Sequence, residues 1–315
     1  MRTSFILAPV SPFRLDYTVW ALRRISKNLI DRWDGNEYTR LFVIQNKPVK
    51  VVVKQCGTPD DSVIDVSVNK KINQELKNEL AEILEMMLGL KQDLRNFYRI
   101  SKKDEYLNSL VNQFKGFKPP RFPTVFEALV NAISCQQISF EAGLQIQNRL
   151  IQKIGIQIAE DNNLFYAFPD PGSLACCSVK ELRRIGYSLR KSEALIHLAS
   201  SILKEGNLFD GLGAMSNDDI INRLCKYNGV GRWTAEYVLL RGMGKIDVFP
   251  RDDIGAQNNL QDLLHLVNKP DYGAISKIIR KWHPYAGLVY FHLLLRKLNQ
   301  KGVLINANDK SQASI

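Results

Sequence analysis

Short apolar runs with strand-like alternation dominate the first part of the chain and predict a small β-sheet. The runs are rich in β-branched and aromatic residues, and turn-forming residues separate them. They occupy residues 5–9, 38–45, 49–55 and 62–68. Segments 19–33 and 72–90 instead space their apolar residues as helices do. Residues 1–100 are therefore predicted to form an N-terminal α+β sheet domain.

From residue 91 onward the strand-like runs largely disappear, and apolar residues recur every three or four positions. The predicted helices are residues 104–113, 125–133, 140–154, 179–186, 191–205, 220–227, 232–240 and 254–266. Proline-rich breaks at 118–123 and 168–172 interrupt the series. The pattern predicts an all-α core over residues 101–300 and a polar tail over 301–315. The fold class is then mainly α with an N-terminal α+β domain.

A short glycine turn joins two of the predicted helices. Gly229, Val230 and Gly231 lie between the apolar-periodic segments 220–227 and 232–240, which predicts a helix-hairpin-helix. Glycines there allow the backbone to come close to a phosphate group and leave the amides at the start of the second helix free to bind it.

An acidic residue follows this hairpin at the start of another predicted helix. The connector Asp-Val-Phe-Pro-Arg-Asp-Asp ends at Asp253, and helical periodicity begins at Ile254. The positive end of the helix dipole favours an ionised carboxylate at that position. An ionised carboxylate at Asp253 suits a general base or a group that stabilises positive charge better than it suits a general acid. A helix N-cap, which stabilises by about 1 kcal/mol, is the structural alternative, and the neighbouring Asp252 is the alternative carboxylate.

The composition of the chain indicates what kind of molecule the protein binds. The 315 residues include 43 Lys and Arg against 32 Asp and Glu, a net charge of +11. This excess favours a phosphate backbone as partner, although many basic proteins bind no nucleic acid. The five cysteines and four histidines lack metal-ligand spacing, so no metal site is predicted. No apolar run is long enough to span a bilayer and no signal peptide is recognisable, so we expect a cytoplasmic, nucleoid-associated protein.

The hairpin Gly-Val-Gly-Arg-Trp-Thr-Ala-Glu-Tyr and the connector together resemble the signature of the helix-hairpin-helix (HhH-GPD) DNA glycosylase superfamily, specifically its 3-methyladenine DNA glycosylase II branch. Segments 126–139 and 186–199 extend the similarity, which covers roughly residues 120–295 in the family's order and spacing. The resemblance implies two all-α lobes with the active-site cleft between them, and a small sheet domain in front.

The resemblance also implies a chemistry. A glycosylase flips a damaged base out of duplex DNA, stacks it on aromatic side chains and stabilises the positive charge that develops on the sugar. Asp253 matches the catalytic Asp that opposes this charge and activates water. Trp233 and Tyr237, four residues apart on one helix face, are the base-pocket candidates, with ordinary core aromatics as the alternative. Trp282, Tyr285 and Tyr290 are further candidates for the pocket wall.

Trp233 further defines the predicted reaction. Strand-cleaving members of the superfamily carry a lysine nucleophile where this chain has Trp233, so the resemblance implies a monofunctional enzyme that uses water. Its expected substrates are alkylated purines, with deaminated purines as an open extension, and its product is an abasic site. No iron–sulfur cluster is expected, since no cysteine follows Cys225. No other cofactor is required, although the hairpin loop of the family often holds a monovalent cation.

DNA contacts are predicted at two places. In the hairpin, the backbone amides, Arg232 and the Thr234 hydroxyl are candidates for phosphate binding, and Arg232 is also spaced for an i,i+4 surface pair with Glu236. At the turn after residue 133, Gln136 and Gln137 stand where the family inserts a side chain into the duplex. The branch has an apolar residue after the first Gln, so wedge, contact to the orphaned base and helix cap all stay open.

Two other functions fit parts of the pattern. An oxidised-purine glycosylase with strand-cleaving activity would share the fold but needs the missing lysine. A helix-hairpin-helix protein that only binds DNA would share the hairpin but has no need for Asp253. In each case the partner is damaged double-stranded DNA, and we expect a monomer because a single lesion lacks two-fold symmetry.

Overall fold

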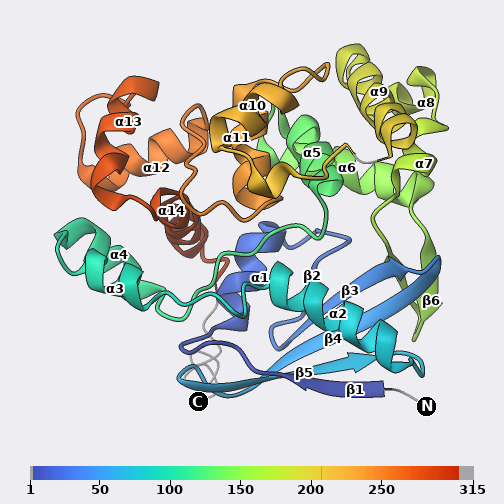
Figure 1. Ribbon diagram of the computed structural model, residues 1–315, viewed down its shortest axis with the longest axis horizontal. Helices are drawn as coiled ribbons and strands as arrows, with labels where there is room; N and C mark the ends of the chain where they lie inside the picture. Colours follow the sequence, from blue (N-terminus) through green and yellow to red (C-terminus); the bar gives the residue numbers. More distant parts are fainter. Residues whose placement is uncertain (1–2, 207, 305–315) are drawn as a thin grey trace.

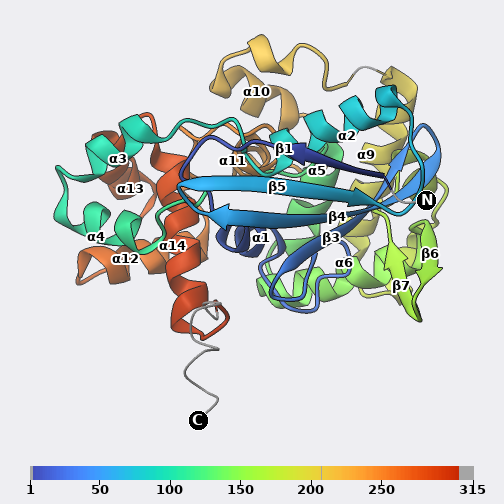
Figure 2. The ribbon, with the colours of Figure 1, turned by 90° about the horizontal axis from the view of Figure 1, so that it is seen from below.

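The computed structural model describes residues 3–206 and 208–304, and it contains the predicted sheet at the beginning of the chain. Five antiparallel strands pair in the order β1-β5-β4-β3-β2. Their bounds are β1 Thr3–Leu7, β2 Arg32–Trp33, β3 Glu37–Ile44, β4 Lys47–Thr58 and β5 Asp61–Val68. The sheet lies at one end of the molecule, below the helices in Figure 1 and in front of them in Figure 2. The prediction of a small N-terminal sheet is confirmed.

Alternation along the strands decides which face of the sheet is buried. In β5, Ile64, Val66 and Val68 are fully buried while the residues between them are exposed or half-buried. Helix α2 (Gln74–Met87) adds one apolar stripe to the same core, formed by Leu76, Leu80, Leu84 and Met87. Sheet and helix thus share a single hydrophobic core.

The first helix differs from its prediction. Residues 19–33 were expected to be helical, but α1 spans Leu15–Arg23 and ends at Arg24, whose φ of 60° is left-handed. The Arg23 guanidinium binds the carbonyl oxygens of Ile25, Ser26 and Trp33. These contacts stabilise a turn in place of further helix, because they use backbone acceptors that a continuing helix would need for its own hydrogen bonds.

Helices form most of the remaining chain. They are α3 Arg95–Ser101, α4 Glu105–Gln113, α5 Val125–Cys135, α6 Phe140–Ile154, α7 Pro171–Ala175, α8 Val179–Arg184, α9 Leu189–Glu205, α10 Asn217–Leu224, α11 Arg232–Arg241, α12 Ile254–Leu264, α13 Tyr272–Ile279 and α14 Ala286–Gln300, with short 3-10 turns at Leu212–Ala214 and Arg280–Trp282. The mainly α fold class is confirmed. None of the described helices is long and apolar enough to cross a membrane.

One hairpin of strands was missed. β6 (Gln157–Glu160) pairs with β7 (Asn163–Tyr166) through a turn whose two residues, Asp161 and Asn162, both have positive φ. Strands of four residues are too short for alternation to stand out from a helical background. Phe165 of β7 lies beneath the cationic groups of Arg32 and Lys50, which joins the hairpin to the sheet domain.

The helices divide between two hydrophobic clusters, but the sheet, which the resemblance places in front of two all-α lobes, shares the first cluster with one group of helices. This first cluster combines the sheet and α2 with α5 to α11. The second combines α3 and α4 with α12 to α14, on the left of Figure 1, so the chain returns late to an earlier part of the fold. The predicted domain boundary at residue 100 falls inside α3, whose Phe97 is buried in the second cluster. Of the predicted tail 301–315, residues 305–315 lie outside the described residues.

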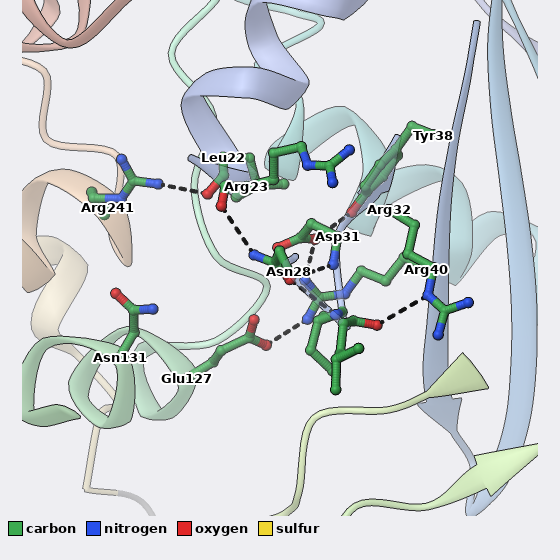
Figure 3. Close-up of polar contacts among 12 residues, drawn as sticks. Leu22, Arg23, Asn28, Asp31, Arg32, Tyr38, Arg40, Glu127, Asn131 and Arg241 are labelled. Atoms are coloured by element: carbon green, nitrogen blue, oxygen red, sulfur yellow. Dashed lines mark hydrogen bonds and ion pairs between the residues drawn. The ribbon is translucent and has the colours of Figure 1, made fainter. Parts of the chain in front are cut away.

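A buried cluster of charges ties the sheet domain to the helical core (Figure 3). Arg40 on β3 contacts Asp31 at 2.7 Å and Glu127 on α5 at 2.6 Å, and the Tyr38 hydroxyl also donates to Asp31. Burial works to lower the pKa of Arg40, but the charges of Glu127 and Asp31 raise it well above its usual value. The guanidinium therefore stays charged, and each carboxylate depends on it for compensation.

Replacing Arg40 should test this connection. Arg40→Met leaves two buried carboxylates without their partner, so we expect a loss of about 3–5 kcal/mol in the free energy of unfolding, measured by urea denaturation. The exposed pair of Lys54 and Glu37, 3.8 Å apart, supplies the control, because Lys54→Met should cost less than about 1 kcal/mol. Similar losses in the two variants would contradict the proposed role of the cluster.

His292 on α14 predicts a pH dependence of stability. The ring is buried and its Nδ1 lies 2.8 Å from the Leu288 carbonyl oxygen, and burial lowers its pKa to about 4. Between pH 6.5 and 4 the unfolded chain gains a proton there that the folded protein does not, so stability falls as the pH falls. We expect His292→Gln to lose less stability over this range than the wild type, by up to about 3 kcal/mol in denaturation curves. Parallel pH curves for the two proteins would refute this.

Candidate active site and DNA-binding surface

A cleft of about 1310 Å³ brings together the residues that the sequence singled out. Its walls come from the end of α1, the turn between α5 and α6, the α10–α11 hairpin and the start of α12. The predicted site residues that line it are Gln136, Gln137, Gly229, Val230, Gly231, Arg232, Trp233, Thr234, Tyr237 and Asp253. Tyr227, Val230, Trp233 and Tyr237 belong to the first hydrophobic cluster. The other lining residues of α12 are Ile254, Gly255 and Asn258, and this helix packs into the second cluster through Ala256 and Leu260.

Asp253 is the N-cap of α12, and its two carboxylate oxygens have different partners. Oδ1 accepts a hydrogen bond from the Ala256 amide at 2.8 Å. Oδ2 accepts from the Tyr290 hydroxyl at 3.1 Å and from the Trp233 indole at 3.4 Å. The cap and the helix dipole favour the negative charge, and the side chain remains half-buried at the cleft. Asp253 therefore caps α12 and lines the cleft at the same time, so its interpretation as an N-cap and its interpretation as a catalytic carboxylate are compatible.

Tyr290 on α14 acts as a donor to this carboxylate. Burial and, after it, the negative charge of Asp253 raise the pKa of the Tyr290 hydroxyl far above its usual value, so the hydroxyl stays protonated. Of the three further aromatic candidates, only Tyr290 reaches the site. Trp282 is buried and donates to Asp104, while the Tyr285 hydroxyl accepts from Asn96, and both side chains belong to the second cluster.

Trp233 and Tyr237 form a continuous aromatic surface on α11. Their ring centroids are 5.6 Å apart with an interplanar angle of 37°. Tyr237 is buried and its hydroxyl donates to Asn131 at 2.6 Å, which fixes the ring, while Trp233 is half-buried. Both rings pack in the interior and also line the cleft. The interpretation as core aromatics and the interpretation as pocket residues are therefore compatible.

Glu236 fixes the connector that carries Asp253, a role the sequence did not reveal. The i,i+4 pair of Arg232 and Glu236, one of the two alternatives for Arg232, is present, but it is not a surface pair because the Glu236 side chain is only 1% exposed. Its oxygens accept from the Arg251 guanidinium at 3.0 Å, the Arg251 amide at 3.1 Å and the Tyr272 hydroxyl at 3.1 Å. The 3.4 Å contact with Arg232 is the longest of the set. The buried Glu236 carboxylate thus joins α11 directly to the turn that precedes Asp253.

The two hairpin glycines have different structural requirements. Gly229 has a φ of +79°, and a Cβ there would lie 2.5 Å from the Ala194 Cβ, so this position needs glycine for the fold. Gly231 has extended backbone, and a Cβ there would meet nothing within 4 Å. The space in front of Gly231, next to the free amides that begin α11, is therefore open to a phosphate. The Val230 side chain is buried and its amide bonds to Tyr227, so Val230 anchors the turn from inside.

Gln136 connects the hairpin to the turn between α5 and α6. Its side-chain amide donates at 2.8 Å to both the Gly229 carbonyl and the Thr234 hydroxyl. The Lys191 ammonium holds the same turn through the carbonyls of Ser134 and Gln136, at 3.0 and 2.7 Å. Thr234 is buried, so its hydroxyl serves this junction first. The Gln136 side chain is thus not free, because its amide holds the hairpin against the turn between α5 and α6.

Two consecutive residues project from that turn. Gln137 is exposed with a φ of +56°, and Ile138 is 42% exposed, unusual for a large apolar side chain beside a cleft. The branch has its apolar residue directly after the first Gln, so the resemblance did not point to Ile138. The exposure of the Ile138 side chain, which only the fold reveals, distinguishes this residue from the other apolar residues of the turn.

Groups that hold metals are not gathered at the cleft. Within residues 3–206 and 208–304, no three His, Cys, Asp or Glu side chains lie close enough together to form a metal site. A monovalent cation in the hairpin loop stays a prediction. Lys245, which lies in the connector, is not among the residues that line the cleft.

Residues 130–284 match the family model of the HhH-GPD superfamily base excision DNA repair proteins. This match spans the α5–α6 turn, the hairpin and Asp253. The chain belongs to the helix-hairpin-helix DNA glycosylase superfamily. Within that superfamily it groups with the 3-methyladenine DNA glycosylase branch, which confirms the resemblance found in the sequence.

Individual relatives agree with this placement. The DNA-3-methyladenine glycosylase of Bacillus subtilis is 27% identical over 282 residues, which is 89% of this chain and 93% of the relative. The structure of the 3-methyladenine DNA-glycosylase from Archaeoglobus fulgidus superposes with a TM-score of 0.80 at 25% identity, covering 92% of this chain and 97% of the other. The counterpart thus extends over most of the chain and beyond the segment that the family model matches.

An oxidised-purine enzyme shares the fold at greater distance. The 8-oxoguanine glycosylase/lyase of Clostridium acetobutylicum, in complex with double-stranded DNA, superposes with a TM-score of 0.75 at 18% identity and covers 96% of this chain and 98% of the other. At that identity the likeness concerns the fold alone.

The contrast between Gly231 and Gly229 gives a test of phosphate binding. Gly231→Ala should keep its stability within about 0.5 kcal/mol by thermal unfolding. It should bind an abasic-analogue duplex roughly tenfold or more weakly, because the methyl group displaces a charge-assisted hydrogen bond. Gly229→Ala is the matched control and should lose at least about 1 kcal/mol of stability through its left-handed backbone. Full DNA affinity in Gly231→Ala would argue against a phosphate at this turn.

Proposed function

We propose that this protein is a monofunctional DNA glycosylase that hydrolyses the N-glycosidic bond of alkylated purines, with deaminated purines as further substrates, and leaves an abasic site in double-stranded DNA. The observation that carries the proposal is the Asp253 carboxylate. It is fixed by hydrogen bonds at the start of α12, beside the Trp233–Tyr237 surface, where the sugar of a flipped nucleotide would meet it.

The chemistry follows from the charge that develops on the sugar. As the glycosidic bond breaks, the deoxyribose acquires oxocarbenium character, and a nearby fixed carboxylate lowers the energy of that state. The contacts from Ala256, Tyr290 and Trp233 orient the carboxylate before the reaction, so little reorganisation is needed. Asp253 then positions or deprotonates the water that attacks the sugar.

Hydrolysis, without strand cleavage, fits the amines near the cleft. Trp233 occupies the place of the family's lysine nucleophile, and an indole cannot form a Schiff base. Lys226 lies on the exposed hairpin turn, and the Lys191 ammonium is engaged by two backbone carbonyls. The proposal therefore requires no metal, no iron–sulfur cluster and no covalent enzyme intermediate.

Binding of the duplex divides between two surfaces. The hairpin amides take the phosphate next to the lesion, and the net charge of +11 supports contacts along the backbone. Ile138, with Gln137 beside it, fills the gap that the flipped nucleotide leaves, because an exposed apolar side chain at a cleft rim stacks well between bases. The protein acts as a monomer on chromosomal DNA inside the cell.

Asp253→Asn is the deciding variant. Asparagine keeps the N-cap, so the fold should survive, while removal of the negative charge should slow base release from alkylated duplex DNA by at least about 100-fold under single-turnover conditions. The released fraction is scored as abasic sites, with and without alkali. Strand breaks in the wild type should need alkali, and borohydride should trap no protein–DNA adduct.

The neighbouring carboxylate supplies a matched control. The Asp252 side chain is exposed and lies one position before Asp253. Asp252→Asn removes the same charge and should keep most of the activity. Equal base release by wild type and Asp253→Asn would refute the mechanism. Tight lesion binding with no base release by the wild type would instead indicate a protein that only binds DNA.

A further inference from the structure

The two parts of the proposed reaction centre belong to different hydrophobic clusters. Trp233 and Tyr237 on α11 pack in the first cluster, whereas α12, which begins after Asp253, packs in the second through Ala256 and Leu260. The distance between a base stacked on α11 and the carboxylate at the start of α12 therefore depends on how these two helices are linked. The direct contact, from the Trp233 indole to the Asp253 carboxylate, is 3.4 Å long, longer than a typical N–H···O bond.

The buried Glu236 and the half-buried Arg251 supply a closer link between α11 and the turn that precedes Asp253. Glu236 accepts hydrogen bonds from the Arg251 guanidinium at 3.0 Å and from the Arg251 backbone amide at 3.1 Å. The second bond fixes the main chain itself, two residues before Asp253. The Tyr272 hydroxyl on α13 donates to the same carboxylate at 3.1 Å.

Arg251 is in turn held by two further helices. Its guanidinium donates to the Ser276 hydroxyl at 2.9 Å and lies over the Tyr272 ring, 4.1 Å from the centroid, and both residues belong to α13. Its carbonyl oxygen accepts from the side-chain amide of Gln257 on α12 at 2.9 Å. Since α11, α12 and α13 all contact this one residue, the turn has little freedom to move relative to them.

Glu236 lies behind the surface that faces DNA. Its side chain is 1% exposed, whereas Arg232, at the start of α11 beside the hairpin amides, is 49% exposed. The contact between them, at 3.4 Å, is longer than either contact between Glu236 and Arg251. A change at Glu236 should therefore alter the placement of Asp253 more than the affinity for DNA.

Stability alone is a poor explanation for a buried pair of this kind. The free energy needed to dehydrate two ionic groups often exceeds their attraction, and apolar residues of similar volume commonly serve a core as well. The pair of Glu236 and Arg251 instead supplies a defined geometry, because the planar guanidinium donates in fixed directions to α11 and to α13.

We propose that Glu236 and Arg251 are positioning residues for base release, which fix the Asp253 carboxylate at the distance from the Trp233–Tyr237 surface that the sugar of a flipped nucleotide requires. Neither residue lines the cleft, so both act through Asp253 and not by contact with the base. The inference rests on the proposed glycosylase function and adds to it a requirement for the link between the two clusters.

The test separates the rate of base release from the affinity for DNA. The rate is measured in single turnovers at saturating enzyme on a duplex that contains 7-methylguanine, and the affinity on a duplex with an abasic analogue. Glu236→Gln keeps the volume but turns an amide donor toward groups that themselves donate, so the rate should fall roughly 10- to 100-fold, the effect of a small misplacement of reacting groups. The affinity should stay within about threefold, because no contact with DNA is removed.

A double variant distinguishes positioning from a general loss of structure. Asp253→Asn already removes the carboxylate through which Glu236 acts, so adding Glu236→Gln to it should slow release by less than about threefold more. If Glu236 served the fold alone, the two losses of rate would multiply, and the inference would be overturned.

Two further variants guard against a loss of fold. Glu127→Gln changes another buried carboxylate paired with an arginine, Arg40 at 2.6 Å, whose link runs to the sheet domain. It should keep the wild-type rate at a temperature at which thermal unfolding shows every variant to be folded. Arg251→Lys changes a side chain that is 24% exposed and keeps its charge, but an ammonium lacks the planar fork that reaches both Glu236 and Ser276. Its rate should also fall, though less than that of Glu236→Gln.

Each result decides a different point. Wild-type rates in Glu236→Gln and Arg251→Lys, together with an inactive Asp253→Asn, would overturn this inference and leave the proposed function standing. An equal loss of rate in Glu127→Gln, or a loss of abasic-analogue affinity in Glu236→Gln as large as its loss of rate, would overturn it as well. Full activity of Asp253→Asn would remove the proposed mechanism and, with it, this inference.

Discussion

Asp253 is held by hydrogen bonds from three helices, and the arrangement of the cleft depends on this convergence. The Ala256 amide of α12 binds one carboxylate oxygen, while Trp233 of α11 and Tyr290 of α14 donate to the other. An ionised carboxylate in a partly enclosed site needs such donors to offset its loss of hydration. The helices of both clusters therefore have to meet at one place, and that place is the cleft.

Buried arginines extend this constraint to the sheet domain. Arg40 joins β3 to α5, and Arg241 joins α11 to the last turn of α1. Each guanidinium bridges elements distant in the sequence, because its planar donors reach two acceptors at once. The sheet domain is thus more than a platform for the helices, since its junction with the core brings Arg24 to the cleft.

Much of the fold and several site residues could be predicted from local patterns. Alternation in β5 and the helical stripe of α2 identified the sheet domain, and the turn at Gly229 and the cap at Asp253 identified the hairpin and the carboxylate. The errors occurred where distant contacts outweighed local preference. Side-chain bonds of Arg23 ended α1 early, and the packing of α11 buried Glu236, which the sequence placed on the surface.

The sequence by itself determined the elements, the family and the residues of the hairpin and its carboxylate, because turns, caps and periodicity arise from interactions within a few positions. Only the tertiary structure decided which side chains share the pocket. Arg24, Phe140, Trp233 and Asp253 come from four separate segments, and only the packing of two hydrophobic clusters brings them together. Such a juxtaposition depends on the shape of the core, which no local pattern records.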